Sequence, residues 1–399
     1  MNRKAFIILA FVMFLTMTGY GIVFPSLPYV AERLGLSAFE MGSLVTGWAV
    51  AQLVATPIWG RFIDRFGRKK VLFIGLAGFA VAFLAVIFVQ SYIQLLLARV
   101  IGAVLSSGSI PAALTIVADS TNDEQRGISM AKMGAVNSLG FLCGPAIGGI
   151  FSPFGMNAPF IVAGCLSLIS LPFVFIFIKE PEKQQVKKSE ENVSFLGSLS
   201  YVTKTGYREL YMLTLGKALA ASSLFAILGY FMIEKFAADP WQVSLCFSLF
   251  AGGSAFVQFF LLNYLYEWNS DYWIIKWGFI LCTAGYLCIA FSGYIWLIAA
   301  GSVAVGVGMA FVRPTVMALL SKQEQIGRGI TMGLDQTMDS LGRVLGPLFG
   351  GFIFSIHIIL PFIGSALICI VMLIGLFIIR GNNQGMWNAS NKEKVYKEA

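Results

Sequence analysis

Long apolar segments recur along the whole chain, and they limit what this sequence can fold into. Each is about 20 residues long, the length that a helix needs to cross a hydrocarbon core of about 30 Å. Hydrophobic residues make up 57% of the 399 positions and charged residues 12%, which excludes an ordinary soluble protein. We predict an all-α membrane protein with twelve transmembrane helices, at approximate positions 5–30, 40–59, 71–90, 94–117, 129–151, 158–178, 209–232, 241–264, 273–292, 294–320, 329–352 and 359–380.

Basic residues fall mainly on one side of this helix arrangement. The side that carries both chain ends holds Arg3, Lys4, Arg61, Arg65, Arg68, Lys69, Lys70, Arg126, Lys179, Lys183, Lys187, Lys188, Lys322, Arg328 and Arg380, whereas the other side holds Arg33 and Lys235. This imbalance follows the positive-inside rule, so we expect both termini in the cytoplasm. The net charge of +8 therefore requires no nucleic acid partner.

A glycine and proline pattern occurs twice and indicates an internal duplication. Gly140-x3-Gly144-Pro145-x2-Gly148-Gly149 reappears 202 positions later as Gly342-x3-Gly346-Pro347-x2-Gly350-Gly351. Two halves related by a repeat are typical of secondary transporters, which bind substrate near the bilayer midplane. We predict two pseudo-symmetric six-helix bundles, residues 1–178 and 209–380, joined by a cytoplasmic linker over 179–208 and followed by a cytoplasmic tail over 381–399.

The eleventh span carries three charges in an otherwise apolar segment. Asp335, Asp339 and Arg343 are four residues apart, so a helix places them on one face. The two aspartates are the only carboxylates predicted deep in the membrane, and the embedded basic residues are Arg99, Lys217, Arg313 and Arg343. Two interpretations stay open: Asp339 and Arg343 form a structural ion pair, or an aspartate binds and releases a proton during transport.

The connection between the second and third spans is short and highly charged. It reads Gly60-Arg61-Phe62-Ile63-Asp64-Arg65-Phe66-Gly67-Arg68-Lys69-Lys70. The simpler interpretation is a topology signal, but two glycines around a single acid are more specific. Gly60 would allow close helix packing, and Asp64 is placed to meet a helix N-terminus or an arginine.

This connection resembles the signature loop of the major facilitator superfamily. Further segments are similar to the drug:proton antiporter branch, the NorA-like and Bmr-like multidrug exporters: 19–28 in the first span, Leu97 to Gly102 in the fourth, Gly140 to Gly149 in the fifth and Val312-Arg313-Pro314 in the tenth. The resemblance covers effectively the whole chain. It implies the major facilitator fold and a location in the bacterial cytoplasmic membrane.

The resemblance also implies roles for individual residues. A conformational lock would consist of Gly60, Asp64, Arg65, Gly67 and Arg68, with Asp64 facing the start of the eleventh span. Arg99 would take part in proton coupling. Our other candidates for that role, Asp335, Asp339 and Arg343, come from the charge pattern of the eleventh span and not from the resemblance. Helix bending and packing would fall to Gly140, Gly144, Pro145, Gly148, Gly149, Gly346 and Pro347.

The sequence departs from the multidrug exporters at two positions where they carry carboxylates, in the seventh and tenth spans. The corresponding residues are Phe225 and Ala310. Either Asp335 and Asp339 replace those acids, or the substrate is not a cation, and lipids, sugars and neutral or zwitterionic drugs then come into question. Our candidates for the substrate cavity are Tyr20, Gln52, Phe141, Phe225, Tyr230, Phe256, Gln258 and Arg313.

The main functional hypothesis is a proton-coupled exporter of amphipathic small molecules, working by alternating access. The alternatives are an exporter of a lipid, sugar or sugar conjugate, and a non-transporting membrane sensor. The six cysteines lack metal-ligand spacing, the single histidine excludes many catalytic arrangements, and no P-loop is present. We therefore expect no enzyme activity, no metal and no cofactor apart from the proton, with the lipid bilayer and a small-molecule substrate as partners of a monomer.

Overall fold

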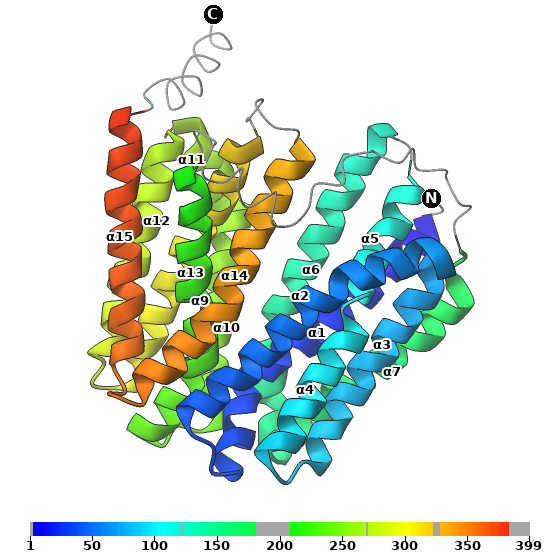
Figure 1. Ribbon diagram of the computed structural model, residues 1–399, viewed down its shortest axis with the longest axis horizontal. Helices are drawn as coiled ribbons and strands as arrows, with labels where there is room; N and C mark the ends of the chain where they lie inside the picture. The colour runs from blue at the N-terminus through cyan, green and yellow to red at the C-terminus, as the bar shows by residue number, and fades with distance from the viewer. Residues whose placement is uncertain (1–2, 122, 181–207, 269, 322–327, 383–399) are drawn as a thin grey trace, which may run out of the picture. The chain divides into compact units, whose positions relative to one another are not determined.

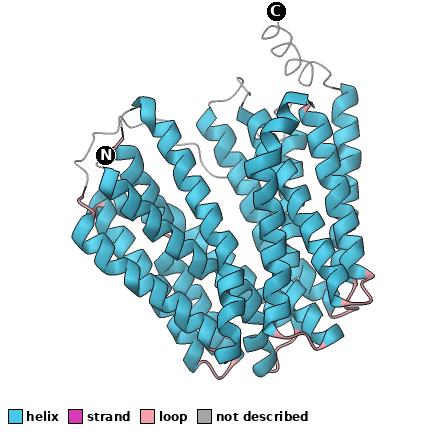
Figure 2. Ribbon diagram, turned by 180° about the vertical axis from the view of Figure 1, so that it is seen from behind, coloured by secondary structure: helices cyan, strands magenta, loops and turns pink. Residues whose placement is uncertain are grey.

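The structure is a computed structural model that describes residues 3–121, 123–180, 208–268, 270–321 and 328–382. Most of the predicted linker and of the predicted tail lies outside these ranges. The regular elements of the described residues are all helical, with short connections (Figures 1 and 2). They are α1 (Arg3–Arg33), α2 (Ala38–Phe66), α3 (Arg68–Ala85), α4 (Tyr92–Ser106), α5 (Ser109–Asp119), α6 (Asp123–Phe151), α7 (Ala158–Phe177), α9 (Arg208–Phe236), α10 (Pro240–Phe256), α11 (Leu262–Trp268), α12 (Asp271–Ala290), α13 (Ile295–Ser321), α14 (Arg328–Phe354) and α15 (Leu360–Asn382), with short 3-10 segments at Val86–Phe88 and Ser152–Phe154 and a π-helical segment at Val257–Leu261.

Among the described residues, eleven helical segments are long and apolar enough to cross a membrane. One of them combines α4 and α5, and another combines α10 with the π-helical segment. The remaining long helix is α14, which has 27 residues and carries the three charges of the eleventh predicted span. It is not among the eleven segments that are apolar enough to cross a membrane. The prediction of an all-α membrane protein is confirmed, and α14 differs from the other long helices in falling outside this set.

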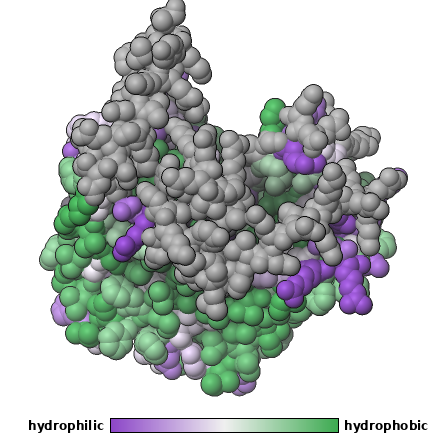
Figure 3. All heavy atoms as spheres, turned by 45° about the horizontal axis from the view of Figure 1, so that its top comes forward, coloured by the Kyte–Doolittle hydropathy of each residue, from purple (hydrophilic) through white to green (hydrophobic). Residues whose placement is uncertain are grey.

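The exterior carries many apolar side chains. Val81, Phe175 and Phe260 are 59%, 69% and 74% exposed. Hydrophobic residues cover most of the described surface in Figure 3, and hydrophilic residues gather in a few patches. Such a surface is unfavourable in water and is expected where helices face lipid.

The chain divides into two compact units. The first comprises residues 1–188 and 228–248, and the second comprises residues 189–227 and 249–399. Helices α9 and α10 therefore contribute to both units. The predicted domain boundaries, which assign all of α9 and α10 to the second half, stay a prediction.

In the first unit, glycines of α6 allow α6 to lie directly against α1. A Cβ atom added at Gly140 would lie 2.5 Å from the carbonyl oxygen of Phe14, and one added at Gly144 would lie 2.6 Å from that of Thr18. Real Cβ atoms do not approach so closely, so larger residues would force the helices apart. Pro145 lies within α6, which continues through it to Phe151.

The Gly144→Val substitution is expected to destabilise the protein, because its side chain would overlap the α1 backbone. Overpacking of this kind typically costs about 1–3 kcal/mol. Gly134→Val provides the matched control, since Gly134 lies on the same helix and an added Cβ would meet no described atom within 4 Å. Thermal unfolding of the purified variants in detergent measures the difference. Equal melting temperatures for the two variants would contradict this explanation of the glycine motif.

In the second unit, the repeated motif on α14 packs against α9 in the same manner. A Cβ atom added at Gly342 would lie 2.9 Å from the carbonyl oxygen of Leu215, and one added at Gly346 would overlap the carbonyl oxygen of Leu219. The Ser222 hydroxyl of α9 donates a hydrogen bond of 2.8 Å to the carbonyl oxygen of Gly342. This close contact holds α14 beside the part of α9 that carries Thr214 and Lys217.

Candidate functional site

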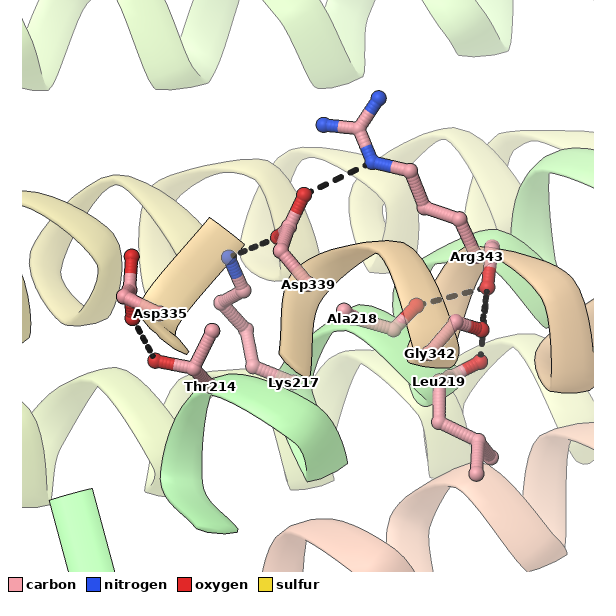
Figure 4. Close-up of polar contacts among 9 residues, drawn as sticks. Thr214, Lys217, Ala218, Leu219, Asp335, Asp339, Gly342 and Arg343 are labelled. Atoms are coloured by element: carbon pink, nitrogen blue, oxygen red, sulfur yellow. Dashed lines mark hydrogen bonds and ion pairs between the residues drawn. The ribbon is translucent and has the colours of Figure 1, made fainter. Parts of the chain in front are cut away.

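A cluster of charged side chains joins α9 and α14 inside the second unit (Figure 4). The Lys217 ammonium group of α9 lies 3.1 Å from Oδ1 of Asp339, and Nε of Arg343 lies 2.8 Å from Oδ2 of the same carboxylate. The predicted pairing of Asp339 with Arg343 is therefore present, but it is only half of the arrangement. Asp339 is a shared acceptor for two cations from two helices.

Asp335 lies one turn before Asp339 and has a different partner. The hydroxyl of Thr214 donates a hydrogen bond of 2.6 Å to Oδ1 of Asp335 (Figure 4). No ion pair to Asp335 is found among the described residues. The two acids of α14 thus differ in kind: one is held by cations, and the other is held by a neutral hydroxyl group.

The cluster is largely buried. Lys217, Asp335 and Asp339 are 6%, 8% and 4% exposed, whereas the Arg343 side chain is 48% exposed. Charges at such positions are costly unless they are paired or hydrogen-bonded. The buried charges of Lys217 and Asp339 are paired in this way, because Asp339 forms ion pairs with Lys217 and Arg343.

A pocket opens beside the cluster. Residues of α9, α13 and α14 line it: Thr214, Lys217, Val312, Arg313, Val316, Met317, Asp335, Gln336 and Asp339. The pocket therefore combines charged groups of both signs with an apolar strip from α13. A molecule that binds there would meet charged groups on one side and apolar side chains on the other.

Arg313 is the one predicted cavity residue that lines this pocket. Tyr20 and Phe141 belong to an aromatic cluster of the first unit together with Phe24, Trp48 and Phe79. Phe225 packs edge-on against Phe250. The remaining candidates are also elsewhere: the Tyr230 hydroxyl donates to the carbonyl oxygen of Leu36, Gln258 donates to Ser254, Phe256 is exposed and Gln52 is half-buried.

Arg99 lies on α4 in the first unit, away from any described carboxylate. Its side chain is 7% exposed, and its guanidinium carbon lies 4.3 Å from the centre of the Trp48 ring, in a cation–π contact. Within the described part of the chain, Nε of Arg99 and Nε1 of Trp48 have no hydrogen-bond partner. The membrane-embedded cation is therefore stabilised by an aromatic ring and not by an ion pair.

The signature loop is held together within the first unit. Arg68 is buried and pairs with Asp119 at the end of α5, at 3.0 Å. The Glu180 carboxylate accepts hydrogen bonds of 2.6 and 2.8 Å from the backbone N–H groups of Arg68 and Lys69, at the start of α3. Gly67 has a φ of +101° and no side chain to cap α3, so the distant Glu180 supplies the cap.

The other loop residues are placed at the surface of this unit. Asp64 and Arg65 are exposed, and Arg65 lies over the ring of Phe66. A Cβ atom added at Gly60 would meet no described atom within 4 Å, so close helix packing does not account for this glycine. The expected partner of Asp64, the start of α14, belongs to the other unit, and this interaction stays a prediction.

Sequence reasoning did not assign Thr214 and Lys217 to the site, although Lys217 was recognised as an embedded cation. The available signal was their spacing of three residues, which places both side chains on one face of α9. In the described ranges, no group of three or more His, Cys, Asp or Glu residues is arranged to hold a metal ion.

Comparisons with known proteins agree on one family. The model described as the Major Facilitator Superfamily matches residues 9–215 and 210–398. Quinolone resistance protein NorA of Staphylococcus aureus (strain MSSA476) is 27% identical over 366 residues, which cover 90% of this chain and 92% of that protein. Multidrug resistance protein 1 of Bacillus subtilis (strain 168) is 28% identical over 359 residues, covering 88% of this chain and 90% of that protein.

Solved structures of transporters share the fold. The nucleoside transporter NupG superposes with a TM-score of 0.79 at 13% identity, covering 95% of this chain and 99% of that chain. The human organic anion transporter MFSD10 superposes with a TM-score of 0.65 at 19% identity, covering 94% and 99%. At these identities the likeness concerns the fold alone.

Proposed function

Because the chain belongs to the Major Facilitator Superfamily, we propose that it exports amphipathic small molecules in exchange for protons, by alternating access. It is a multi-pass membrane transporter and not an enzyme. The names of its relatives, which refer to quinolone resistance and multidrug resistance, support export of drug-like compounds. The observation that carries the proposal is the buried charge cluster of α9 and α14 beside a pocket.

Within this cluster, we assign the proton to Asp335. Neutralising Asp339 would leave Lys217 and Arg343 without their acidic partner, and buried charges without a partner are strongly unfavourable. Asp335 can change its charge without breaking an ion pair, because the Thr214 hydroxyl is able both to donate and to accept a hydrogen bond. Asp339 then acts as the fixed counter-ion, and Arg99 stays a proposed participant in coupling.

The proposed setting is the bacterial cytoplasmic membrane, with both termini in the cytoplasm. The bacterial relatives and the one-sided distribution of basic residues support it. We further propose that the protein works as a monomer with the lipid bilayer and a small-molecule substrate as its partners, without nucleic acid. The coupling ion is the proton, and the mechanism requires no cofactor.

The proposal is tested with purified protein in liposomes that carry an imposed pH gradient. Dyes of different charge are compared, with ethidium as the lipophilic cation. Export of any dye that moves is expected to require the gradient, and a protonophore is expected to stop it. Empty liposomes provide the background. Dye movement that ignores the gradient would contradict proton coupling, and no movement of any dye would favour the sensor hypothesis.

Asp64→Asn is expected to lower the export rate while the folded protein remains in the membrane. The reason is that the Asp64 carboxylate, facing the N-terminal end of α14, would stabilise one of the two transport conformations. An amide at position 64 would stabilise that conformation less well. Lys70→Gln, on the same loop and also exposed, provides the control for loss of a charge. Transport in the liposome assay is compared at equal protein amounts. An unchanged rate for Asp64→Asn would exclude the lock.

A further inference from the structure

The charges around the pocket do not all pair with one another. Asp339 is occupied by Lys217 and Arg343, at 3.1 and 2.8 Å. Two pocket-lining charges then remain without an ionic partner among the described residues, Arg313 on α13 and Asp335 on α14. They have opposite signs, and no ion pair joins them.

Arg313 is accessible from the pocket and close to the rest of the cluster. Its side chain is exposed, and it interacts electrostatically with both Lys217 and Asp339. Val312, Val316 and Met317 of the same helix line the pocket beside it. The guanidinium group is therefore presented next to an apolar wall, with its hydrogen-bond donors available for a carboxylate.

A simple cation does not complement this pocket. Among the described residues that line it, Asp335 is the acid without an ion pair, and the cations Arg313 and Lys217 line the same pocket. A cation bound to Asp335 in this pocket would therefore meet two like charges. A simple anion fits Arg313, but its negative charge would favour protonation of Asp335, so anion and proton would bind together and not in exchange.

We propose that the substrate is an amphipathic zwitterion, whose carboxylate binds Arg313 and whose ammonium group binds Asp335. The apolar part would contact Val312, Val316 and Met317. The ammonium group and the proton then compete for the same carboxylate, which is the requirement for exchange transport. This inference rests on the proposed function, because it names the substrate class of that exporter.

The test uses four forms of one fluorescent molecule in the liposome assay. Nε-dansyl-lysine is a zwitterion, its methyl ester is a cation, its Nα-acetyl form is an anion, and the doubly blocked form is neutral. The zwitterion is expected to be exported with about tenfold higher efficiency than each singly blocked form, since each form loses one charge-assisted interaction.

Variants of Arg313 assign the carboxylate end. Arg313→Gln is expected to lower export of the zwitterion about tenfold and to change export of the methyl ester by less than about twofold. Arg313→Lys should restore part of the zwitterion export, because it keeps the charge but not the planar fork. Lys276→Gln is the control, since Lys276 lies between the rings of Trp273 and Phe377 and outside the pocket.

The outcomes separate this inference from the proposed function. Gradient-driven export of ethidium without preference for the zwitterion would overturn the inference and leave the exporter standing. Equal loss of all four forms in Arg313→Gln would likewise overturn the assignment of Arg313 to the carboxylate. If neither ethidium nor any dansyl form moves with the gradient, both the exporter and its substrate class are wrong.

Discussion

Asp335→Asn is expected to reduce gradient-driven export to the level of empty liposomes, while the protein stays folded. Asparagine has nearly the same shape, and its amide oxygen is still able to accept the hydrogen bond from Thr214. It cannot bind and release a proton, so the exchange cycle stops although the pocket is otherwise retained. The measurement is dye export under an imposed pH gradient, together with thermal unfolding of the same preparation.

Two controls make the result specific to the proton. Thr214→Val removes the hydroxyl but keeps the carboxylate, so it should retain coupled export at a reduced rate, about fivefold lower for a lost hydrogen bond of about 1 kcal/mol. Exchange of labelled for unlabelled substrate without a gradient should persist in Asp335→Asn with a lower substrate affinity, because the amide oxygen still accepts a hydrogen bond from the substrate ammonium group but carries no charge. Normal gradient-driven export by Asp335→Asn would rule out Asp335 as the proton carrier.

Asp339→Asn is expected to have the largest effect on stability. It removes the acceptor of both Lys217 and Arg343, and breaking a buried pair by removing one partner typically costs about 3–5 kcal/mol. Less folded protein should reach the membrane, its melting temperature should fall, and export should be lost with it. Arg343→Gln should lower the melting temperature less than Asp339→Asn does. The Arg343 side chain is half exposed, so its removal disturbs the buried part of the cluster less.

A double variant distinguishes a counter-ion from a proton carrier. Replacing Lys217 with Met in the Asp339→Asn background removes the buried cation that had lost its partner. The melting temperature should then recover most of what the single variant lost, since a buried ion pair is often replaced by apolar residues without loss of stability. A double variant no more stable than Asp339→Asn alone would show that the Lys217 contact does not govern folding.

The helices and the faces through which they pack closely could be predicted because their causes are local. Apolar length defines each span, and the small residues of the repeated motif define which face packs closely. Gly144 and Gly346 occupy equivalent positions in the two packed helix pairs, α1 with α6 and α9 with α14. Arg343 was likewise found from a spacing of four within one helix.

Contacts between distant segments were not predictable in this way. Lys217 and Asp339 are 122 positions apart, and Thr214 and Asp335 are 121 positions apart. Helical periodicity describes the faces of one helix but not the partner that lies against a face. For this reason the sequence suggested an isolated pair of Asp339 with Arg343, whereas the structure adds the cation that changes the interpretation of both acids.

The contacts of the signature loop could not be predicted from the sequence either. Its sequence indicated a short connection dense in charge, but not that Arg68 pairs with Asp119 or that Glu180 caps α3. Both partners are more than 50 positions away, on segments whose own sequences carry no mark of the contact. Gly67 is explained twice by the structure, once by its positive φ and once by the nearby Glu180 carboxylate.

Helix α9 is one continuous helix that contributes residues to both units, and it carries part of the charge cluster. Thr214 and Lys217 lie in the part assigned to the second unit, and residues from Leu228 onward belong to the first. There Tyr230 donates its hydroxyl to the carbonyl oxygen of Leu36, and Gly229 lies against Pro28. A helix rises about 1.5 Å per residue, so Lys217 and Leu228 are separated by roughly 16 Å along the axis of α9. Thr214 and Lys217 of the charge cluster and these contacts of the first unit therefore belong to one unbroken helix, with no loop between them.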